Sequence, residues 1–277
     1  MSFDYKKIFF AFSLVIIQSS ITFSQSGYEL EFDGDDDYVE TPGLLGEPAN
    51  VTLAAWAKVA SNQRGELISL GNHVAIRLNG TNKVAHRGFF RGTSTWHATG
   101  VDSTLAPGWH FFTYTNYDSS GTRIQKFYID GNQVARTAVA DAISYSGDGR
   151  NTRIGMHGSN NTYADFHGSI DDVGVWSKGL TSLEVRSLFN TGQIRGYHKN
   201  FGDYNSKDKL VANWDFSEGS GSILGANVTS AIWTPRLIET IDNLRVTAFD
   251  IERDRLYSVH PGTNSSADKA AVVSIVC

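Results

Sequence analysis

The feature that most constrains the fold is a succession of short segments in which apolar and polar residues alternate. In YELEF, Tyr28, Leu30 and Phe32 fall on one side and two glutamates on the other. A period of two is typical of a β-strand with one buried face. About ten such segments, separated by Gly, Asn, Asp and Ser, lie between residues 28 and 176. The pattern predicts an all-β fold, an antiparallel sandwich.

Two local motifs refine this prediction. In FYIDGNQVA, two strand-like arms flank Asp130 and Gly131, a dipeptide that tolerates the positive φ of a tight hairpin turn. The segment GLTSLEVRSLFNTG predicts a short amphipathic helix, because Thr181 and Glu184 have the spacing of a capping box and Gly192 offers a C-terminal stop. Its apolar stripe indicates that the helix packs on the rim of the sandwich, with a structural role.

The N-terminus has the pattern of a secretory signal peptide, predicted over residues 1–24. Lys6 and Lys7 precede the apolar run at 8–17, and small polar residues follow it. This run is too short to span a bilayer. The interpretation predicts a mature chain that is secreted, extracellular or on the cell surface, and that has no membrane span; an uncleaved anchor is the alternative.

Charge and cysteine content narrow the classes of partner and of stabilising bond. The net charge of -5 and the pI near 5.9 give no basic footprint, which argues against a nucleic-acid partner. The chain has one cysteine, Cys277, so an internal disulfide is excluded. For an exported protein, this makes a structural cation a more favoured means of stabilisation.

Four segments occur in the order seen in a known family. They are ELEFDGDDDYVETP, VTLAAWAKV, GWHFFTYTNYDSSGTRIQKFYIDGNQV and FHGSIDDVGVWSKGLTSLEVRSLFNTG. This order resembles the laminin-G-like, concanavalin A-like and pentraxin-related jelly rolls. The resemblance implies an all-β, antiparallel two-sheet jelly-roll sandwich and a carbohydrate- or protein-binding module. We assign the laminin-G-like domain to residues 25–200. The C-terminal segment, 201–277, contains LVANWDFSEGSG, which resembles a family segment that normally precedes the module; it is interpreted as a closing strand or as the start of an incomplete second module.

The aspartate-rich stretch FDGDDDY raises the question of a metal site. An EF-hand is excluded, because Tyr38 stands where the loop needs glycine and Leu44 where it needs a bidentate glutamate. Carboxylates and turn carbonyls do suit Ca²⁺, and the resemblance implies a structural Ca²⁺ near the rim. If the first and closing strands are neighbours, Asp33 is expected to share the ion with Asp171 or Asp172.

The predicted metal ligands are therefore Asp33, Asp35, Asp171 and Asp172. Strand alternation is expected to send Asp171 and Asp172 to opposite faces, so that only one of them points into the sandwich. The alternative is that the aspartates hydrogen-bond the amides of their own turns.

Carbohydrate sites on such sandwiches pair an exposed aromatic face with side chains that bond hydroxyl groups. The richest stretch is KVAHRGFFRGTSTWHATG, and GMHGSNNTYADFHG adds a polar loop before the closing strand. Alternate residues must pack in the core, so about half of these aromatics are buried. The predicted ligand-binding residues are Arg87, Arg91, Trp96 and Tyr163.

These observations predict a non-catalytic module that binds extracellular carbohydrate or a surface or matrix protein. An enzyme on the same fold, a glycoside hydrolase or polysaccharide lyase, is the first alternative. Glu29, Glu31 and Asp33 alternate onto one face, as paired catalytic carboxylates do, but a solvated outer face on an edge strand is favoured. The second alternative is a structural or adhesive module without a small ligand. No catalytic residue is predicted, and the only cofactor predicted is Ca²⁺.

Overall fold

The computed structural model describes residues 29–35, 37–60, 64–81, 83–159, 164–192 and 196–216. It also describes the backbone of three further strand pieces at 226–227, 246–250 and 255–260. The predicted signal peptide, residues 1–24, lies outside the described residues, as does Tyr163.

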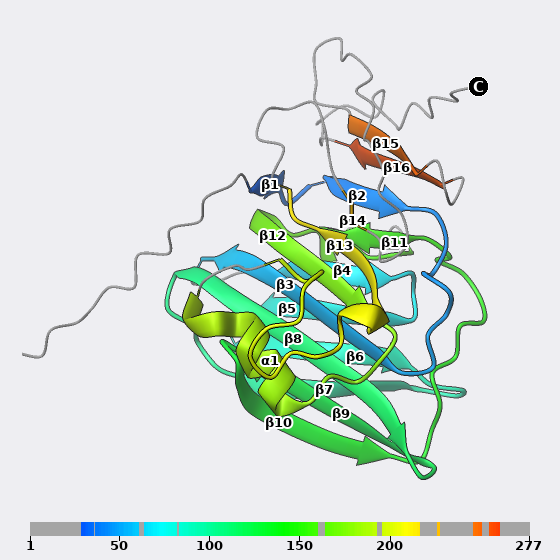
Figure 1. Cartoon of the computed structure of the whole chain (residues 1–277). Helices are drawn as coiled ribbons and strands as arrows, with labels where there is room; N and C mark the ends of the chain where they lie inside the picture. The colour runs from blue at the N-terminus through cyan, green and yellow to red at the C-terminus, as the bar shows by residue number, and fades with distance from the viewer. Residues whose placement is uncertain are drawn as a thin grey trace, which may run out of the picture.

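The described strands form two antiparallel sheets stacked as a sandwich, as the alternation predicts (Figure 1). The first sheet has eight strands, and β1 (Leu30–Asp33) pairs with β12 away from the main path. Its path runs β10 (Asn132–Val139), β9 (Thr122–Ile129), β8 (Gly108–Ser119), β3 (Val51–Val59), β12 (His167–Trp176), β13 (Leu210–Trp214) and β14 (Ala226–Asn227).

The second sheet also has eight strands, and its outward face carries the candidate functional site. In spatial order these are β15 (Val246–Asp250), β16 (Arg255–His260), β2 (Tyr38–Thr41), β11 (Thr152–Ile154), β4 (Gly65–Leu70), β5 (Val74–Thr81), β6 (Lys83–Arg91) and β7 (Trp96–Asp102).

The core between the sheets is made by one face of each strand. In β3, Leu53 and Ala55 face this core while Trp56 faces outward, as the sequence pattern predicts. All residues of β3 except Lys58 are buried, because its outward face is covered as well. The inward side chains of β5 and β6, such as Ile76 and Phe90, complete the core from the second sheet.

The outward face of the first sheet is covered by α1 (Ser182–Phe189) and by the segment at 196–206 (Figure 1). The predicted capping box is present: the Glu184 amide donates to Thr181 Oγ1 at 3.2 Å, and the Thr181 amide donates to Glu184 Oε2 at 2.9 Å. Beneath this cover lies a second apolar cluster that contains Trp56, Trp176 and Tyr204. No helix in the described ranges is long and apolar enough to cross a membrane.

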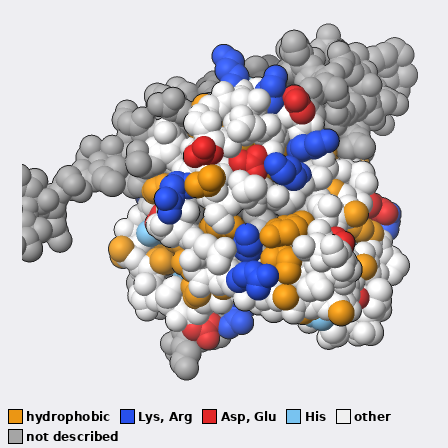
Figure 2. All heavy atoms as spheres, turned by 60° about the horizontal axis from the view of Figure 1, so that its bottom comes forward, with side chains coloured by type: hydrophobic (Ala, Val, Ile, Leu, Met, Phe, Trp, Pro, Cys, Tyr) orange, Lys and Arg blue, Asp and Glu red, His pale blue; other side chains and the backbone are white. Residues whose placement is uncertain are grey.

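The C-terminal segment contributes strands to both sheets. β13 pairs with β12 in the first sheet, and β16 pairs with β2 at the edge of the second. Figure 2 shows another side of the molecule, where Lys and Arg side chains stand around a central group of hydrophobic side chains, with Asp and Glu among them. That face is neither uniformly basic nor uniformly acidic.

Candidate functional site

The outward face of the second sheet is lined by alternate residues of β5, β6 and β7. The register places Ala75 opposite Phe89, and Arg91 opposite Trp96. The intervening Phe90 is fully buried in the core, whereas Trp96 is 46% exposed. Because side chains on a strand alternate between faces, the same stretch of chain supplies both core and surface aromatics.

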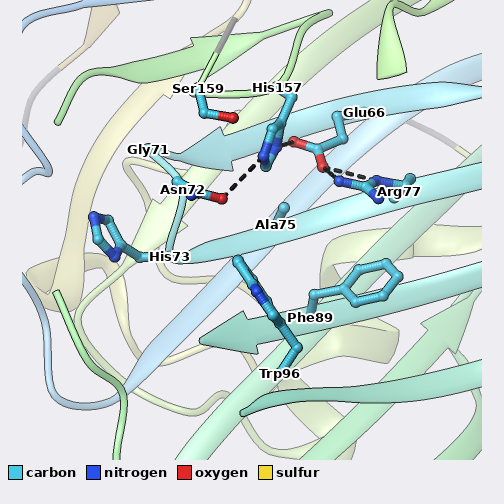
Figure 3. A pocket seen from close by; sticks show the side chains of 10 residues that line it. All are labelled: Glu66, Gly71, Asn72, His73, Ala75, Arg77, Phe89, Trp96, His157 and Ser159. Atoms are coloured by element: carbon cyan, nitrogen blue, oxygen red, sulfur yellow. Dashed lines mark hydrogen bonds and ion pairs between the residues drawn. The ribbon is translucent and has the colours of Figure 1, made fainter. Parts of the chain in front are cut away.

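A hollow of about 340 Å³ opens on this face (Figure 3). Trp96 and Phe89 stand on one side of it, with Asn72, His157 and Glu66 across from them. Ala75 has only a methyl group, which keeps the floor between the two sides low. The remaining lining residues are Gly71, His73, Arg77 and Ser159.

The far side of the hollow is held by a chain of polar contacts around Glu66. This carboxylate is fully buried; its Oε1 accepts from Arg77 Nε at 2.8 Å, and its Oε2 lies 2.8 Å from His157 Nδ1. His157 Nε2 lies 3.0 Å from Asn72 Oδ1. A buried charge is stable only when paired and hydrogen-bonded, so these contacts fix the wall in one arrangement. The Arg77 guanidinium also lies 5.1 Å from the ring centre of Phe89.

The position of Trp96 is fixed by Asp141, from the segment that follows β10. Asp141 accepts hydrogen bonds from the Thr93 amide at 3.2 Å and the Thr93 hydroxyl at 2.9 Å, and it lies 2.7 Å from His97 Nε2. The bond to His97, reinforced by those from Thr93 and Ala142, holds the pKa of the Asp141 carboxyl well below its usual range. These bonds tie down the turn between β6 and β7 that ends at Trp96.

A second hollow, of about 380 Å³, lies on the other side of Trp96. Asn72 and Trp96 line both hollows, so the two form one groove with the indole between them. The second hollow is otherwise lined by polar and small residues, which are Arg91, Gly92, Thr93, Ser94, Thr95, Gly147 and Asp148. Both volumes fall in the range of about 300–1,000 Å³ that is typical of ligand pockets.

The predicted ligand-binding residues are partly brought together. Trp96 lines both hollows and Arg91 lines the second. Arg87 lies on the same outward face but lines neither hollow, and its guanidinium pairs with Asp102 at 2.6 Å. Tyr163 lies outside the described residues, so its role as a ligand-binding residue stays a prediction. Sequence reasoning missed Glu66, which pairs with Arg77 across the β4–β5 hairpin.

His73 also lines the first hollow but adds no charge to it at neutral pH. Its Nδ1 lies 2.9 Å from the Ser144 carbonyl. Burial lowers the pKa of His73; the bond to Ser144 opposes this effect, and the positive charges of Arg91 and Arg150 reinforce it.

The aspartate-rich turn and the closing strand do not meet in the way the calcium prediction requires. The β1–β12 register pairs Asp33 with His167 and Leu30 with Ile170, so Asp171 lies beyond the opposite end of β1. In the turn, the Asp35 amide donates to Asp33 Oδ1 at 2.8 Å, and the Asp33 amide donates to Asp37 Oδ2 at 2.9 Å. These are bonds to turn amides, as the alternative interpretation describes.

Asp171 and Asp172 are both buried, in a sheet whose outward face is covered as well as its inward face. A bulge between Asp171 and Gly174 shifts the register against β3, and Asp172 has a φ of 42°. Burial raises the pKa of Asp172 well above its usual value, and the charges of Asp171 and Asp215 add to the effect. Among the described residues, no group of three or more His, Cys, Asp or Glu is placed to hold a metal ion. Calcium binding stays a prediction.

Comparison with known proteins gives the class to which this fold belongs. Residues 33–186 match the family model Laminin_G_3, described as the concanavalin A-like lectin/glucanases superfamily. The chain therefore belongs to this superfamily, as the order of its motifs indicates. No curated protein sequence matches the chain.

Several solved structures share the fold at low sequence identity. One, from Bacteroides ovatus, is described as a "putative carbohydrate binding protein"; it is 13% identical with a TM-score of 0.55, over 83% of this chain and 57% of that one. A pentraxin of Limulus polyphemus is 13% identical with a TM-score of 0.47, over 73% of this chain and 93% of that one. The CBM40 of a Ruminococcus gnavus sialidase, in complex with sialyllactose, is 16% identical with a TM-score of 0.43, over 58% and 96%. These similarities concern the fold alone.

Proposed function

We propose that this chain is a non-catalytic carbohydrate-binding module that holds a sugar chain in the groove of the second sheet. The observation that carries the proposal is the half-exposed Trp96 between two polar hollows. An indole face stacks on the apolar C–H surface of a pyranose, while neighbouring polar groups bond its hydroxyls. The bonds to Asp141 hold this platform in place before a ligand arrives, which lowers the entropic cost of binding.

The carboxylates in the groove support binding rather than hydrolysis. A retaining glycosidase needs two carboxyl groups about 5 Å apart, one of them free to act as nucleophile. The groove has two carboxylates among its lining residues, Glu66 in the first hollow and Asp148 in the second. Glu66 is bonded to Arg77 and His157, so it is not free to act as a nucleophile. Outside the groove, Glu29 accepts from the Ser169 hydroxyl at 3.1 Å. A glycoside hydrolase or lyase is the rival function, and assays for reducing sugar or unsaturated product on a polysaccharide panel test it.

The experiment that tests the proposal is a glycan array followed by calorimetry with the variant Trp96→Ala. Loss of a central stacking tryptophan is expected to weaken glycan binding by about thirtyfold or more. Leu183→Ala is the matched control, because Leu183 is 57% exposed on α1, away from the groove. Absence of any glycan hit, together with capture of a surface or matrix protein, would favour the structural or adhesive alternative.

We further propose that the module acts outside the cytoplasm, on the basis of the signal-like N-terminus. Ca²⁺ binding by the turn that holds Asp33 and Asp35 is a separate proposal, supported by the exposure of both side chains. Calorimetric titration with Ca²⁺ after chelation tests it: heat and a rise in melting temperature are expected, and the absence of both would remove the proposal.

A further inference from the structure

The arginines on the outward face of the second sheet differ in whether a carboxylate neutralises them. Arg77 pairs with Glu66, Arg87 with Asp102 at 2.6 Å, and Arg153 with Glu40 at 2.7 Å. Within the described ranges, Arg91 makes no ion pair with any Asp or Glu. Among the described arginines of this face, Arg91 is therefore the one whose charge is available for a ligand.

The cross-strand partner of Arg91 is the exposed Trp96. The neighbouring arginines of this face have other cross-strand partners: Arg77 lies opposite Glu66 on one side and Arg87 on the other, and Arg87 lies opposite Gly100. The charges of Arg77 and Arg87 are paired with Glu66 and Asp102, whereas the cross-strand neighbour of Arg91 is an indole, which carries no charge. A cation beside an aromatic face is the arrangement that binds a sugar carrying an anionic group.

The surroundings of Arg91 leave its guanidinium at the wall of the second hollow. Gly147 has a φ of 99°, and a Cβ there would lie 2.8 Å from Arg91 Nη1, so the lack of a side chain lets the loop approach the guanidinium. The other ionisable group among the lining residues is Asp148, whose carboxylate is not within ion-pair distance of Arg91. Arg150, on the same loop, is already bonded to Glu47.

The charge of the first hollow is balanced in a different way. Glu66 offsets Arg77 there, and His73 is neutral because burial lowers its pKa. The two hollows on either side of Trp96 thus differ: one is a polar, charge-balanced hollow and the other has a guanidinium without a partner. Each hollow alone has the volume of a ligand pocket, and the two adjoin at Trp96 and Asn72, so a ligand that fills both is expected to have more than one sugar unit.

We infer that the groove takes an oligosaccharide of at least two units in which a sugar on the Arg91 side of Trp96 carries a carboxylate or sulfate group. This inference rests on the proposed function, because it specifies the ligand of the same groove. The chemistry that recognises the ligand is the charge-assisted hydrogen bond from the Arg91 guanidinium to an oxyanion.

The experiment uses pairs of ligands that share a backbone and differ in charge. The full chain is titrated with tetragalacturonate and its methyl ester, and with a κ-carrageenan tetrasaccharide and its desulfated form. The charged member of at least one pair is expected to bind about tenfold more tightly than its neutral partner, as for one charge-assisted hydrogen bond. The two pairs distinguish a carboxylate ligand from a sulfate ligand.

Variants then assign the preference to Arg91. Arg91→Gln is expected to reduce affinity for the charged ligand to that for the neutral one, and Arg91→Lys to restore part of the difference. Arg87→Gln is the matched control and is expected to change neither affinity, because Arg87 lines neither hollow. Asp148→Asn is expected to strengthen binding of the charged ligand by up to about fivefold, as for removal of an exposed like charge. The melting temperature of each variant confirms folding.

The outcomes separate this inference from the proposed function. Equal binding of charged and neutral members, unchanged by Arg91→Gln, would overturn the role of Arg91 while leaving a carbohydrate groove in place. Binding of no member of either pair, together with an empty glycan array, would overturn both. Charge-dependent binding that survives Trp96→Ala would place the anion site elsewhere on the surface and would also contradict the inference.

Discussion

The outward faces of the two sheets use the same kinds of residue in different ways. On the first sheet, Trp56 and Trp176 are buried beneath α1 and the segment at 196–206. On the second sheet, Trp96 is 46% exposed and flanks two polar hollows. An aromatic residue on an outward strand face is therefore buried or left exposed according to what covers the sheet. Substitutions on the two faces are expected to separate stability from binding.

The largest expected effect comes from comparing Trp176→Ala with Trp96→Ala. Trp176 is fully buried and its Nε1 donates to the Tyr204 hydroxyl at 2.9 Å, so truncation is expected to lower the free energy of unfolding by about 3 to 5 kcal/mol. Truncation of the exposed Trp96 is expected to change it by less than about 0.5 kcal/mol. Urea unfolding of both variants measures this. Equal losses of stability would show that Trp96 is a packing residue and not a binding surface.

His86 and His157, on the inward and outward sides of the second sheet, differ in their hydrogen bonding. His157 on the outward side is bonded to Glu66 and Asn72, whereas the fully buried His86 has no side-chain hydrogen-bond partner among the described residues. Burial lowers the pKa of His86 from 6.5 to about 4, and the backbone of Ser103 partly opposes this shift.

As the pH falls, His86 is protonated in the unfolded chain before it is protonated in the folded one. The stability contributed by neutral His86 is therefore present above pH 6.5 and is lost as the pH falls from 6.5 to 4. The loss is expected to reach about 3 kcal/mol. Urea unfolding of wild type and His86→Leu at pH 7.5, 5.5 and 4.5 isolates this contribution. As the pH falls, the free energy of unfolding of His86→Leu should rise relative to that of the wild type. A difference between the two free energies that does not depend on pH would contradict the lowered pKa of His86.

The polar wall of the groove is expected to contribute less to stability than the covered aromatic face. Glu66→Gln removes the charge that Arg77 and His157 surround, and we expect a loss of about 2 to 3 kcal/mol, below that of a fully buried pair because the Arg77 side chain is 19% exposed. Asp102→Asn, in the exposed pair with Arg87, is the control and should cost less than about 1 kcal/mol. Similar losses in both variants would show that the wall is not preorganised by Glu66.

The smallest expected effect tests the helix that covers the first sheet. Thr181→Ala removes the cap on α1 and should lower the free energy of unfolding by about 1 kcal/mol. Thr181→Ser keeps the hydroxyl and should retain most of the stability that the cap contributes. Glycan binding should be unchanged in both, because α1 does not line the groove. A loss of binding in Thr181→Ala would show that the two outward faces are coupled.

Much of the fold could be predicted because strand and helix signals are local. The alternation in YELEF put Leu30 and Phe32 on one side of a strand, and both pack in the core while Glu31 is exposed. The spacing of Thr181 and Glu184 predicted the capping box. The groove was less accessible to prediction. Trp96 and Arg91 were predicted from composition, but Glu66 and His157 meet across 91 positions of sequence, which no local pattern reports.

Asp171 and Asp172 show what the alternation rule leaves out. A bulge with a positive φ at Asp172 interrupts the strand at this pair, which the rule treats as regular. A bulge adds one residue to a strand and shifts the phase of every following side chain. Its position depends on the partner strand β3, so the sequence of β12 alone does not indicate it.

By itself, the sequence predicted most of the strands, the cap at which the helix begins, and the apolar face of the predicted strands, because backbone geometry imposes these periods locally. It did not predict β4, which carries Glu66, and it placed the stop of the helix at Gly192, whereas the C-cap is Asn190 in the left-handed conformation. Tertiary structure decided which outward face stays open, which described arginine of that face lacks an ion pair, and which acids meet. Those outcomes depend on the register between strands distant in sequence and on the segments that cover each sheet. For this protein, the candidate groove follows from that register, and its proposed ligand follows from Arg91, which lies opposite Trp96 and is in no ion pair within the described residues.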